Sequence, residues 1–337
     1  MEIVPGIIQL KIPIPNNPLG NLNAYLLKCK TGYIMVDVGW PTQETLDILI
    51  EKLADIDLKP QDINAIFITH AHPDHLGLAS KMRELYGIEI MMHESEAPSA
   101  APDRWELDDH IWKWLLLNGM PESDIDMLKQ RPWGQHQFTW RVEPDVLLKG
   151  GEKLELESSY VEVLFTPGHS RGHLCLYDAE RKVLLAGDHM LPVITPSINF
   201  YPRSAANPLG CFIDSLKKIQ SLDVDVVLPA HQDIFHNFEE RLQQLIRHHE
   251  ERASELLVAM GSSSKTAYQI MLDMQWVGAS SDVVLGKELE PIQQMSACAE
   301  TLAHLEYLRL EGVVERVVAE DKALFKSNVE STDIRIA

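Results

Sequence analysis

The chain has few cysteines: it contains four among 337 residues, and no two of them form a Cys-x-x-Cys pair. This spacing argues against a disulfide framework and against a structural zinc knuckle, so we expect four free thiols. No apolar run approaches the length of a membrane span. The first residues lack the basic and apolar regions of a signal peptide. We therefore expect a cytoplasmic protein with no membrane partner.

Positive charge is also scarce. Lys and Arg number 30 against 50 Asp and Glu, which gives a formal net charge of −20. Such a field repels phosphate backbones, so we expect no nucleic-acid partner. A Gly-rich phosphate loop and a dinucleotide-binding fingerprint are absent from the sequence. The hydrophobic content of 45% is that of an ordinary globular protein.

Histidine, by contrast, is concentrated in the segment Thr69-His-Ala-His-Pro-Asp-His75, which follows an apolar run typical of a buried strand. Imidazole nitrogens and carboxylate oxygens are ligands that Zn²⁺ and similar divalent ions prefer. In an extended turn, His70 and His72 point to one side. Asp74 and His75 enter the next helix and point to another side. One segment can therefore serve two metal positions.

Three later strand-like segments also end in a residue that can bind metal. These residues are His169 after residues 160–165, Asp188 after residues 182–186, and His231 after residues 223–228. Pro or Gly lies beside each one and turns the chain there. Four strand ends that each carry His or Asp are expected where a metal site lies along one edge of a sheet sandwich.

Taken together, these segments resemble the metallo-β-lactamase-fold hydrolases, in the branch that holds glyoxalase II, the lactonases and the lactamase-beta-2-type proteins. The resemblance covers about residues 5–250 and implies an α+β fold, an αββα sandwich. The matching segments are Val36-Asp-Val-Gly39, Thr69-His-Ala-His-Pro-Asp-His75, Thr166-Pro-Gly-His169, Leu185-Ala-Gly-Asp188 and Pro229-Ala-His231.

The resemblance implies two divalent metal ions per chain, with zinc expected and iron or manganese as alternatives. It assigns one ion to His70, His72 and His169, the other to Asp74, His75 and His231, and both to Asp188 as a bridge. Asp37 would orient a ligand imidazole without binding metal. We take Asp37 and Asp74 as the catalytic candidates. The sequence departs from many relatives at Gln232, where they carry Gly.

In the implied chemistry, a hydroxide shared by two metal ions attacks a small ester, thioester or lactone that is partly apolar. One alternative is a phosphodiesterase or ribonuclease on the same metal site, which the net charge disfavours. Another is a mononuclear iron enzyme of the persulfide dioxygenase type. It would use only His70 or His72, His169 and Asp188.

Two segments differ in composition from the rest of the chain. The first lies within the predicted catalytic domain, residues 1–255, and the second follows that domain. Residues 95–150 hold five of the seven tryptophans and two expected helices, at 111–117 and 121–130. This insert either caps the metal cleft or packs on the sheet. Residues 256–337 pair two expected helices, 266–274 and 295–310, with a two-stranded ribbon, which is a winged-helix-like pattern.

Charge argues against nucleic-acid binding by the C-terminal segment. Residues 251–337 contain 8 Lys and Arg against 14 Asp and Glu, a net charge of −6. A DNA-binding wing should be basic, so we expect a packing, dimerising or substrate-shaping role, and a homodimer stays open. In the long helix expected over residues 238–260, His248 and His249 are predicted to be exposed.

Overall fold

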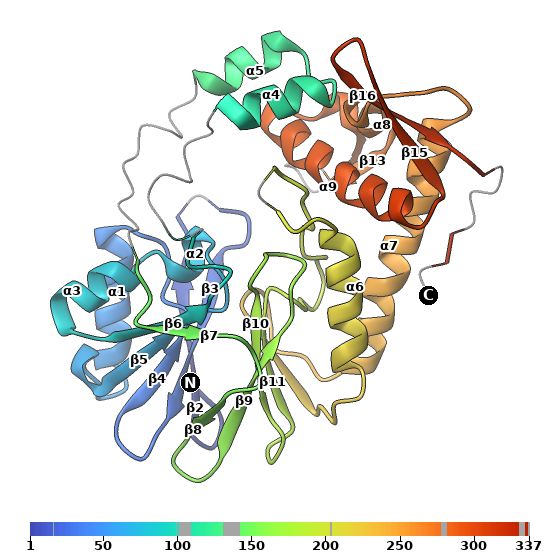
Figure 1. Ribbon diagram of the computed structural model, residues 1–337. Helices are drawn as coiled ribbons and strands as arrows, with labels where there is room; N and C mark the ends of the chain where they lie inside the picture. The colour runs from blue at the N-terminus through green and yellow to red at the C-terminus, as the bar shows by residue number, and fades with distance from the viewer. Residues whose placement is uncertain are drawn as a thin grey trace. The chain divides into compact units, whose positions relative to one another are not determined.

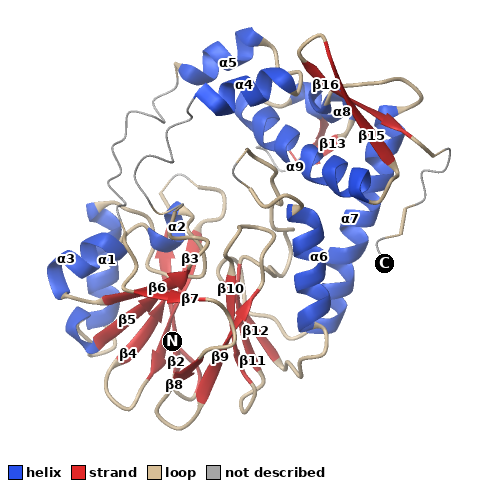
Figure 2. Ribbon diagram, viewed as in Figure 1, coloured by secondary structure: helices blue, strands red, loops and turns tan. Residues whose placement is uncertain are grey.

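The computed structural model describes residues 1–15, 17–98, 100, 109–130, 142–202, 204–277, 282–329 and 334–335. Within these residues the fold mixes helices with β-sheets, which confirms the predicted α+β class (Figures 1 and 2). The chain forms two compact units. Unit 1 comprises Met1–Arg104, Phe138–Pro196 and Ser215–Leu242, and unit 2 comprises Trp105–Gln137, Ser197–Asp214 and Gln243–Ala337.

Unit 1 contains two sheets. The first has seven strands in chain order, antiparallel from β1 to β4 and parallel from β4 to β7. Its strands are β1 (Glu2–Val4), β2 (Ile7–Pro13), β3 (Asn21–Lys28), β4 (Tyr33–Val36), β5 (Ile63–Phe67), β6 (Glu89–His93) and β7 (Val146–Leu148).

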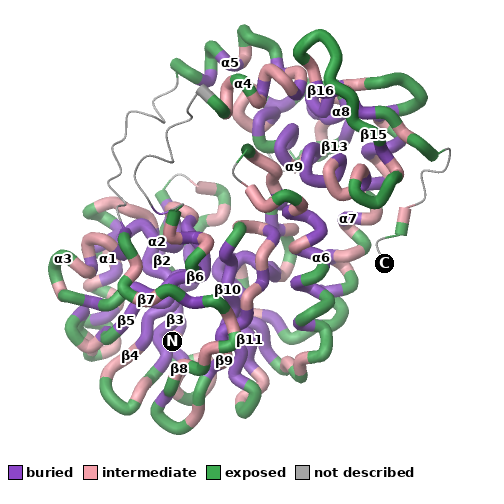
Figure 3. The backbone as a smooth tube through the Cα atoms, in the orientation of Figure 1, coloured by how far each residue is buried: buried purple, intermediate pink, exposed green. Residues whose placement is uncertain are grey.

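The second sheet has five strands in the order β12-β11-β10-β9-β8, and only β11 and β12 run parallel. Its strands are β8 (Lys153–Glu155), β9 (Tyr160–Phe165), β10 (Leu174–Asp178), β11 (Val183–Gly187) and β12 (Val226–Pro229). Strands β10, β11 and β12 are buried along their whole length (Figure 3). Burial on both faces explains why their sequences are continuous apolar runs.

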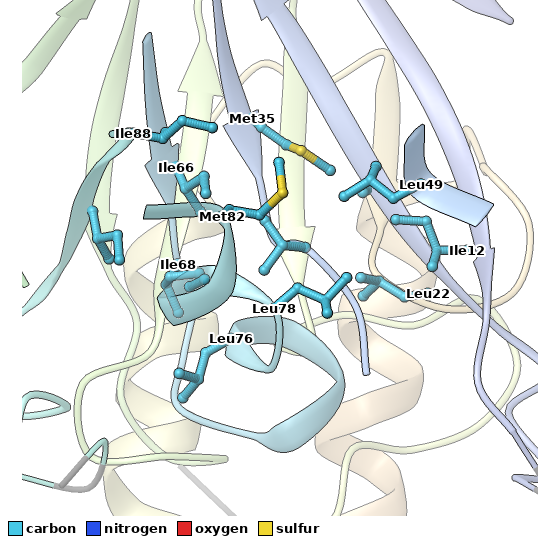
Figure 4. Packing of buried hydrophobic residues seen from close by; sticks show 14 of the residues in the cluster. Ile12, Leu22, Met35, Leu49, Ile66, Ile68, Leu76, Leu78, Met82 and Ile88 are labelled. Atoms are coloured by element: carbon cyan, nitrogen blue, oxygen red, sulfur yellow. The ribbon is translucent and has the colours of Figure 1, made fainter. Parts of the chain in front are cut away.

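Apolar side chains of the two sheets share one buried cluster, to which both contribute, for example Leu27, Val36, Phe67, Val163, Leu176 and Leu185. A second cluster joins the first sheet to helices α1 (Gln43–Ala54) and α3 (Ala79–Tyr86). In Figure 4, Leu49 of α1 and Met82 of α3 pack with Met35 and Ile66 of the sheet. The loops at the strand ends are thereby fixed by a close-packed core.

The remaining helices of the sheet region are short or lie on the boundary between the units. They are η1 (Pro60–Asp62), α2 (Pro73–Leu76), α6 (Pro208–Ile219) and α7 (Phe238–Met260). The boundary falls inside α6 and inside α7. Among the described residues, no helix has the length and apolar character needed to cross a membrane. All four cysteines are free thiols, as predicted.

Unit 2 has its own apolar core, which includes Leu115, Ile125, Ile270 and Leu305. Its elements are α4 (Asp109–Leu117), α5 (Glu122–Lys129), α8 (Ala267–Asp273), β13 (Gln275–Val277), β14 (Val283–Leu285), η4 (Gly286–Glu288), α9 (Pro291–Leu310), β15 (Val314–Ala319) and β16 (Lys322–Ser327). The expected helices at 111–117, 121–130, 266–274 and 295–310 are present as α4, α5, α8 and α9, and the expected ribbon is β15–β16. The hairpin β13–β14 was not expected.

The insert helices α4 and α5 bury their apolar side chains with those of α8 and α9. Of the five tryptophans predicted to mark the insert, Trp105, Trp133 and Trp140 lie outside the described residues. The prediction for His249 was wrong: this side chain is 1% exposed because α9 packs against it through His304, with a ring nitrogen of each 3.1 Å apart.

Candidate metal centre

Side chains that can bind metal follow the C-terminal ends of four strands in unit 1. Strand β5 leads through residues 68–72 into α2, which carries Asp74 and His75. The other three predicted ligands follow β9, β11 and β12, namely His169, Asp188 and His231. Parallel neighbours bring such ends to the same edge, as β4 with β5 and β11 with β12 do (Figure 2). All seven predicted ligands fall into two groups of neighbouring side chains.

The first group comprises His70, His72, His169 and Asp188. Nδ1 of His72 lies 2.8 Å from Nε2 of His70 and 3.1 Å from Nε2 of His169. Oδ2 of Asp188 lies 3.5 Å from Nε2 of His169 and 4.0 Å from Nε2 of His70. Three ring nitrogens and one carboxylate oxygen therefore face one another.

The second group comprises Asp74, His75 and His231. Oδ2 of Asp74 lies 3.3 Å from Nε2 of His231 and 3.8 Å from Nε2 of His75. The other oxygen of Asp188, Oδ1, lies 3.4 Å and 3.7 Å from the same two nitrogens. Asp188 thus presents one carboxylate oxygen to each group.

These donor sets fit divalent metal ions. Ligand atoms at 2.0–2.2 Å around a tetrahedral zinc ion lie roughly 3.3–3.6 Å apart, and the spacings here run from 2.8 to 4.0 Å. Nε2 of His75, Nε2 of His231 and Oδ1 of Asp188 are buried and have no hydrogen-bond partner among the described residues. Buried polar atoms are costly unless they are satisfied. A bound cation in the second group would satisfy all three.

Asp37 contacts His75, one of the predicted ligands, and belongs to neither group. It is 1% exposed, and its Oδ2 lies 2.7 Å from Nδ1 of His75. Its two oxygens also accept hydrogen bonds from the backbone N–H of Thr69 at 2.9 Å and from the Thr69 hydroxyl at 2.8 Å. The Asp37 backbone is left-handed, with φ 56°, a conformation in which Asp and Asn are enriched. This arrangement directs Nε2 of His75 toward the second group.

Sequence reasoning gave His173 no role, yet it contacts the backbone of Asp188. Its Nε2 accepts a hydrogen bond from the Asp188 N–H at 3.1 Å. Its Nδ1 therefore carries the proton and donates to the Thr166 hydroxyl at 2.9 Å. In the same way, Nδ1 of His231 donates to the carbonyl oxygen of Asn21 at 2.9 Å. In the sequence, only the position of His173 four residues after His169 could have indicated that it lies near this site.

The two groups differ in their electrostatics. Burial, and then the nearby His169, lower the pKa of His72 to about 3. Burial by itself also lowers the pKa of His75, but nearby carboxylates, that of Asp37 foremost, outweigh it and raise this pKa to about 10. Burial likewise lowers the pKa of His70, so His70 and His72 are neutral, whereas the carboxylates around His75 hold a proton on that ring where a bound cation would take its place. Both properties favour a bound cation.

Comparisons with known proteins agree with a metal-binding role for these two groups of side chains. Residues 17–231 match the family described as the metallo-beta-lactamase superfamily. The probable metallo-hydrolase YqjP of Bacillus subtilis (strain 168) is 23% identical over 95% of this chain and 98% of that protein. The atrochrysone carboxyl ACP thioesterase AacuM of Aspergillus aculeatus is 22% identical over 82% of this chain and 72% of that protein. The crystal structure of a metallo-beta-lactamase family protein from Thermus thermophilus has 30% identity and a TM-score of 0.78, covering 97% of this chain and all of that one.

Proposed function

The chain belongs to the metallo-beta-lactamase superfamily and is a metal-dependent hydrolase, and we propose that it uses two divalent ions, zinc by preference, to hydrolyse a small ester, thioester or lactone. The observation that carries the proposal is the placement of Asp188, whose two oxygens face different ligand groups. In this proposal His70, His72 and His169 hold one ion, Asp74, His75 and His231 hold the other, and Asp188 holds both.

Bound zinc lowers the pKa of a coordinated water to about 7 and polarises a carbonyl oxygen. The protein's own part is to fix the ligands and to leave one side open. His70, His75 and His231 are fully buried, whereas the side chains of Asp74 and Asp188 keep 11% and 10% of their surface exposed. Substrate would approach from the side where Asp74, Asp188 and the half-buried His72 keep exposed surface. In this proposal Asp74 is also a catalytic carboxylate. Asp37 acts indirectly, through His75.

A partly apolar, uncharged substrate fits this surface best. The loop after Asp188 exposes Val193 and Ile194, at 75% and 37% of their surface. Gln232, next to His231, accepts hydrogen bonds from both of their N–H groups. Two apolar side chains therefore lie on a loop that follows Asp188 in sequence and is hydrogen-bonded to the residue next to His231. The net charge of −20 also favours neutral esters over anionic phosphodiesters.

The second ligand group is the reason for proposing two ions. A mononuclear iron oxygenase would keep the same sequence motif, so metal analysis of the purified chain separates the two readings. For the C-terminal segment, residues 256–337, we propose a winged-helix-like domain built from α8, α9 and the ribbon β15–β16. Its net charge, −6 over residues 251–337 (8 Lys and Arg against 14 Asp and Glu), supports a role other than nucleic-acid binding.

The test is a substrate panel on protein that has been stripped of metal and reconstituted with zinc. Acyl thioesters, lactones and a bis-aryl phosphodiester are compared, with the metal-free protein and Asp188→Asn as controls. We expect zinc-dependent hydrolysis of a thioester or lactone that exceeds phosphodiester hydrolysis. Faster cleavage of the phosphodiester would replace the proposal by the nuclease alternative.

A further inference from the structure

Glu96 is a buried carboxyl group with no part in the mechanism above. It lies in the loop after β6 and is 2% exposed. Its Oε2 accepts the backbone N–H of Ala71 at 2.9 Å, and its Oε1 accepts the backbone N–H of Gly172 at 2.6 Å. Both hydrogen bonds are buried. One side chain thus joins two loops that are far apart in sequence.

Both loops carry ligands of the first group. Ala71 lies between His70 and His72, and Gly172 follows His169 by three residues. The three imidazoles of the group therefore lie on two segments, and a backbone N–H of each segment donates a hydrogen bond to Glu96. Ligands of the second group have other supports: Asp37 contacts His75, and the Asn21 carbonyl accepts from His231.

The junction at Glu96 is closely packed. A Cβ atom added to Gly172 would lie 2.7 Å from Cγ of Glu96 and 3.0 Å from its backbone nitrogen. Only glycine allows this approach of backbone to side chain, and so little space is left for the loop to move. The hydrogen bond from Gly172 is correspondingly short.

We propose that Glu96 is a positioning residue that holds the loop of His70 and His72 against the loop of His169, and so sets the metal affinity of the first group alone. The inference rests on the proposed two-ion site, and it adds that one residue outside the ligands controls the affinity for one ion and not for the other. Loss of one Glu96 contact should let the two loops separate. The first ion should then bind more weakly while the second is unaffected.

The variant Glu96→Gln tests this directly, because a side-chain amide has one acceptor oxygen and its nitrogen would face a backbone N–H. Glu152→Gln is the matched control. Glu152 also accepts two backbone N–H groups, from Lys149 at 2.7 Å and Gly150 at 2.8 Å, but both belong to a single turn that carries no ligand.

Zinc dissociation constants are measured by competition with a chromophoric chelator in two single-group backgrounds. His231→Ala keeps the first group, and His72→Ala keeps the second. We expect Glu96→Gln to weaken zinc binding about 10–100-fold in the His231→Ala background, as is usual for groups that support ligands. No change is expected in the His72→Ala background, and none for Glu152→Gln in either.

Equal affinities with and without Glu96→Gln in the His231→Ala background, or equal losses in both backgrounds, would overturn the inference. Wild-type protein that binds fewer than two ions would instead refute the proposed function. Glu96→Asp, with a carboxyl group one methylene shorter, should shift the constant in the same direction. If neither variant folds in the presence of excess zinc, judged by circular dichroism, Glu96 supports the whole fold and the inference also fails.

Discussion

Replacement of Asp37 by Asn tests how far one contact outside the ligand groups controls the metal site. Asn has nearly the same shape, and it tolerates the left-handed backbone that Asp37 adopts at φ 56°. The change therefore exchanges one oxygen for an NH₂ group with little strain. His75 and Thr69 together make three contacts with the two oxygens of Asp37.

Asn can keep only some of these three contacts, because its side-chain nitrogen cannot accept a hydrogen bond from His75 or Thr69. A hydrogen bond to a charged group contributes about 1.5–3 kcal/mol, and about 1.4 kcal/mol corresponds to a tenfold change in affinity. Loss of the contact to His75, which is 2.7 Å long and buried, should therefore weaken zinc binding in the second group about 10–100-fold. Asp37→Asn should lower hydrolysis at limiting zinc by a similar factor.

The assay is a zinc titration of metal-free protein, with guanidinium unfolding in parallel. Asp178→Asn is the control, because Asp178 is also fully buried and accepts two backbone N–H groups and an arginine, but it contacts no ligand. The control should lose stability and keep its zinc affinity. If Asp37→Asn loses stability but binds zinc as the wild type does, Asp37 serves the fold and the reasoning is refuted.

Three further predictions concern other parts of the chain. Asp188→Asn should lose affinity for both ions, since its oxygens face both groups, and elemental analysis that still finds two ions would contradict this. Burial lowers the pKa of His304 to about 3 and that of His249 well below 6.5. Below pH 6.5 the unfolded chain takes up protons that the folded chain cannot, so the free energy of unfolding should fall by about 1.4 kcal/mol per pH unit for each histidine. Unfolding of His304→Gln between pH 7 and 5 should show a smaller fall. Gln232→Gly should relieve about 1–2 kcal/mol of strain at φ 67° yet free the loop at 193–194, which would raise KM for apolar substrates at unchanged zinc content.

The grouping of the seven predicted ligands could be foreseen from the sequence because each residue is marked by a local pattern. A buried strand, a turn residue and a His or Asp lie within a few positions of one another, and a sheet brings such ends together. The helices α4, α5, α8 and α9 were predicted for the same reason, since periodicity and caps are local signals.

Other features depend on partners that are far away in sequence. The two N–H groups bound by Glu96 lie 25 and 76 residues from it, and no local pattern indicates either. His249 was predicted to be exposed because its neighbours are polar, but its partner His304 is 55 residues further on. The packing of the insert also had no signal, since Tyr268 contacts Asp124 across 144 residues.

The most direct test of the central claim is the metal content of the purified chain after reconstitution with excess zinc and removal of unbound metal. Two ligand groups that share Asp188 predict two zinc ions per chain. Binding of a single ion at saturation, or of one iron with zinc excluded, would contradict the account.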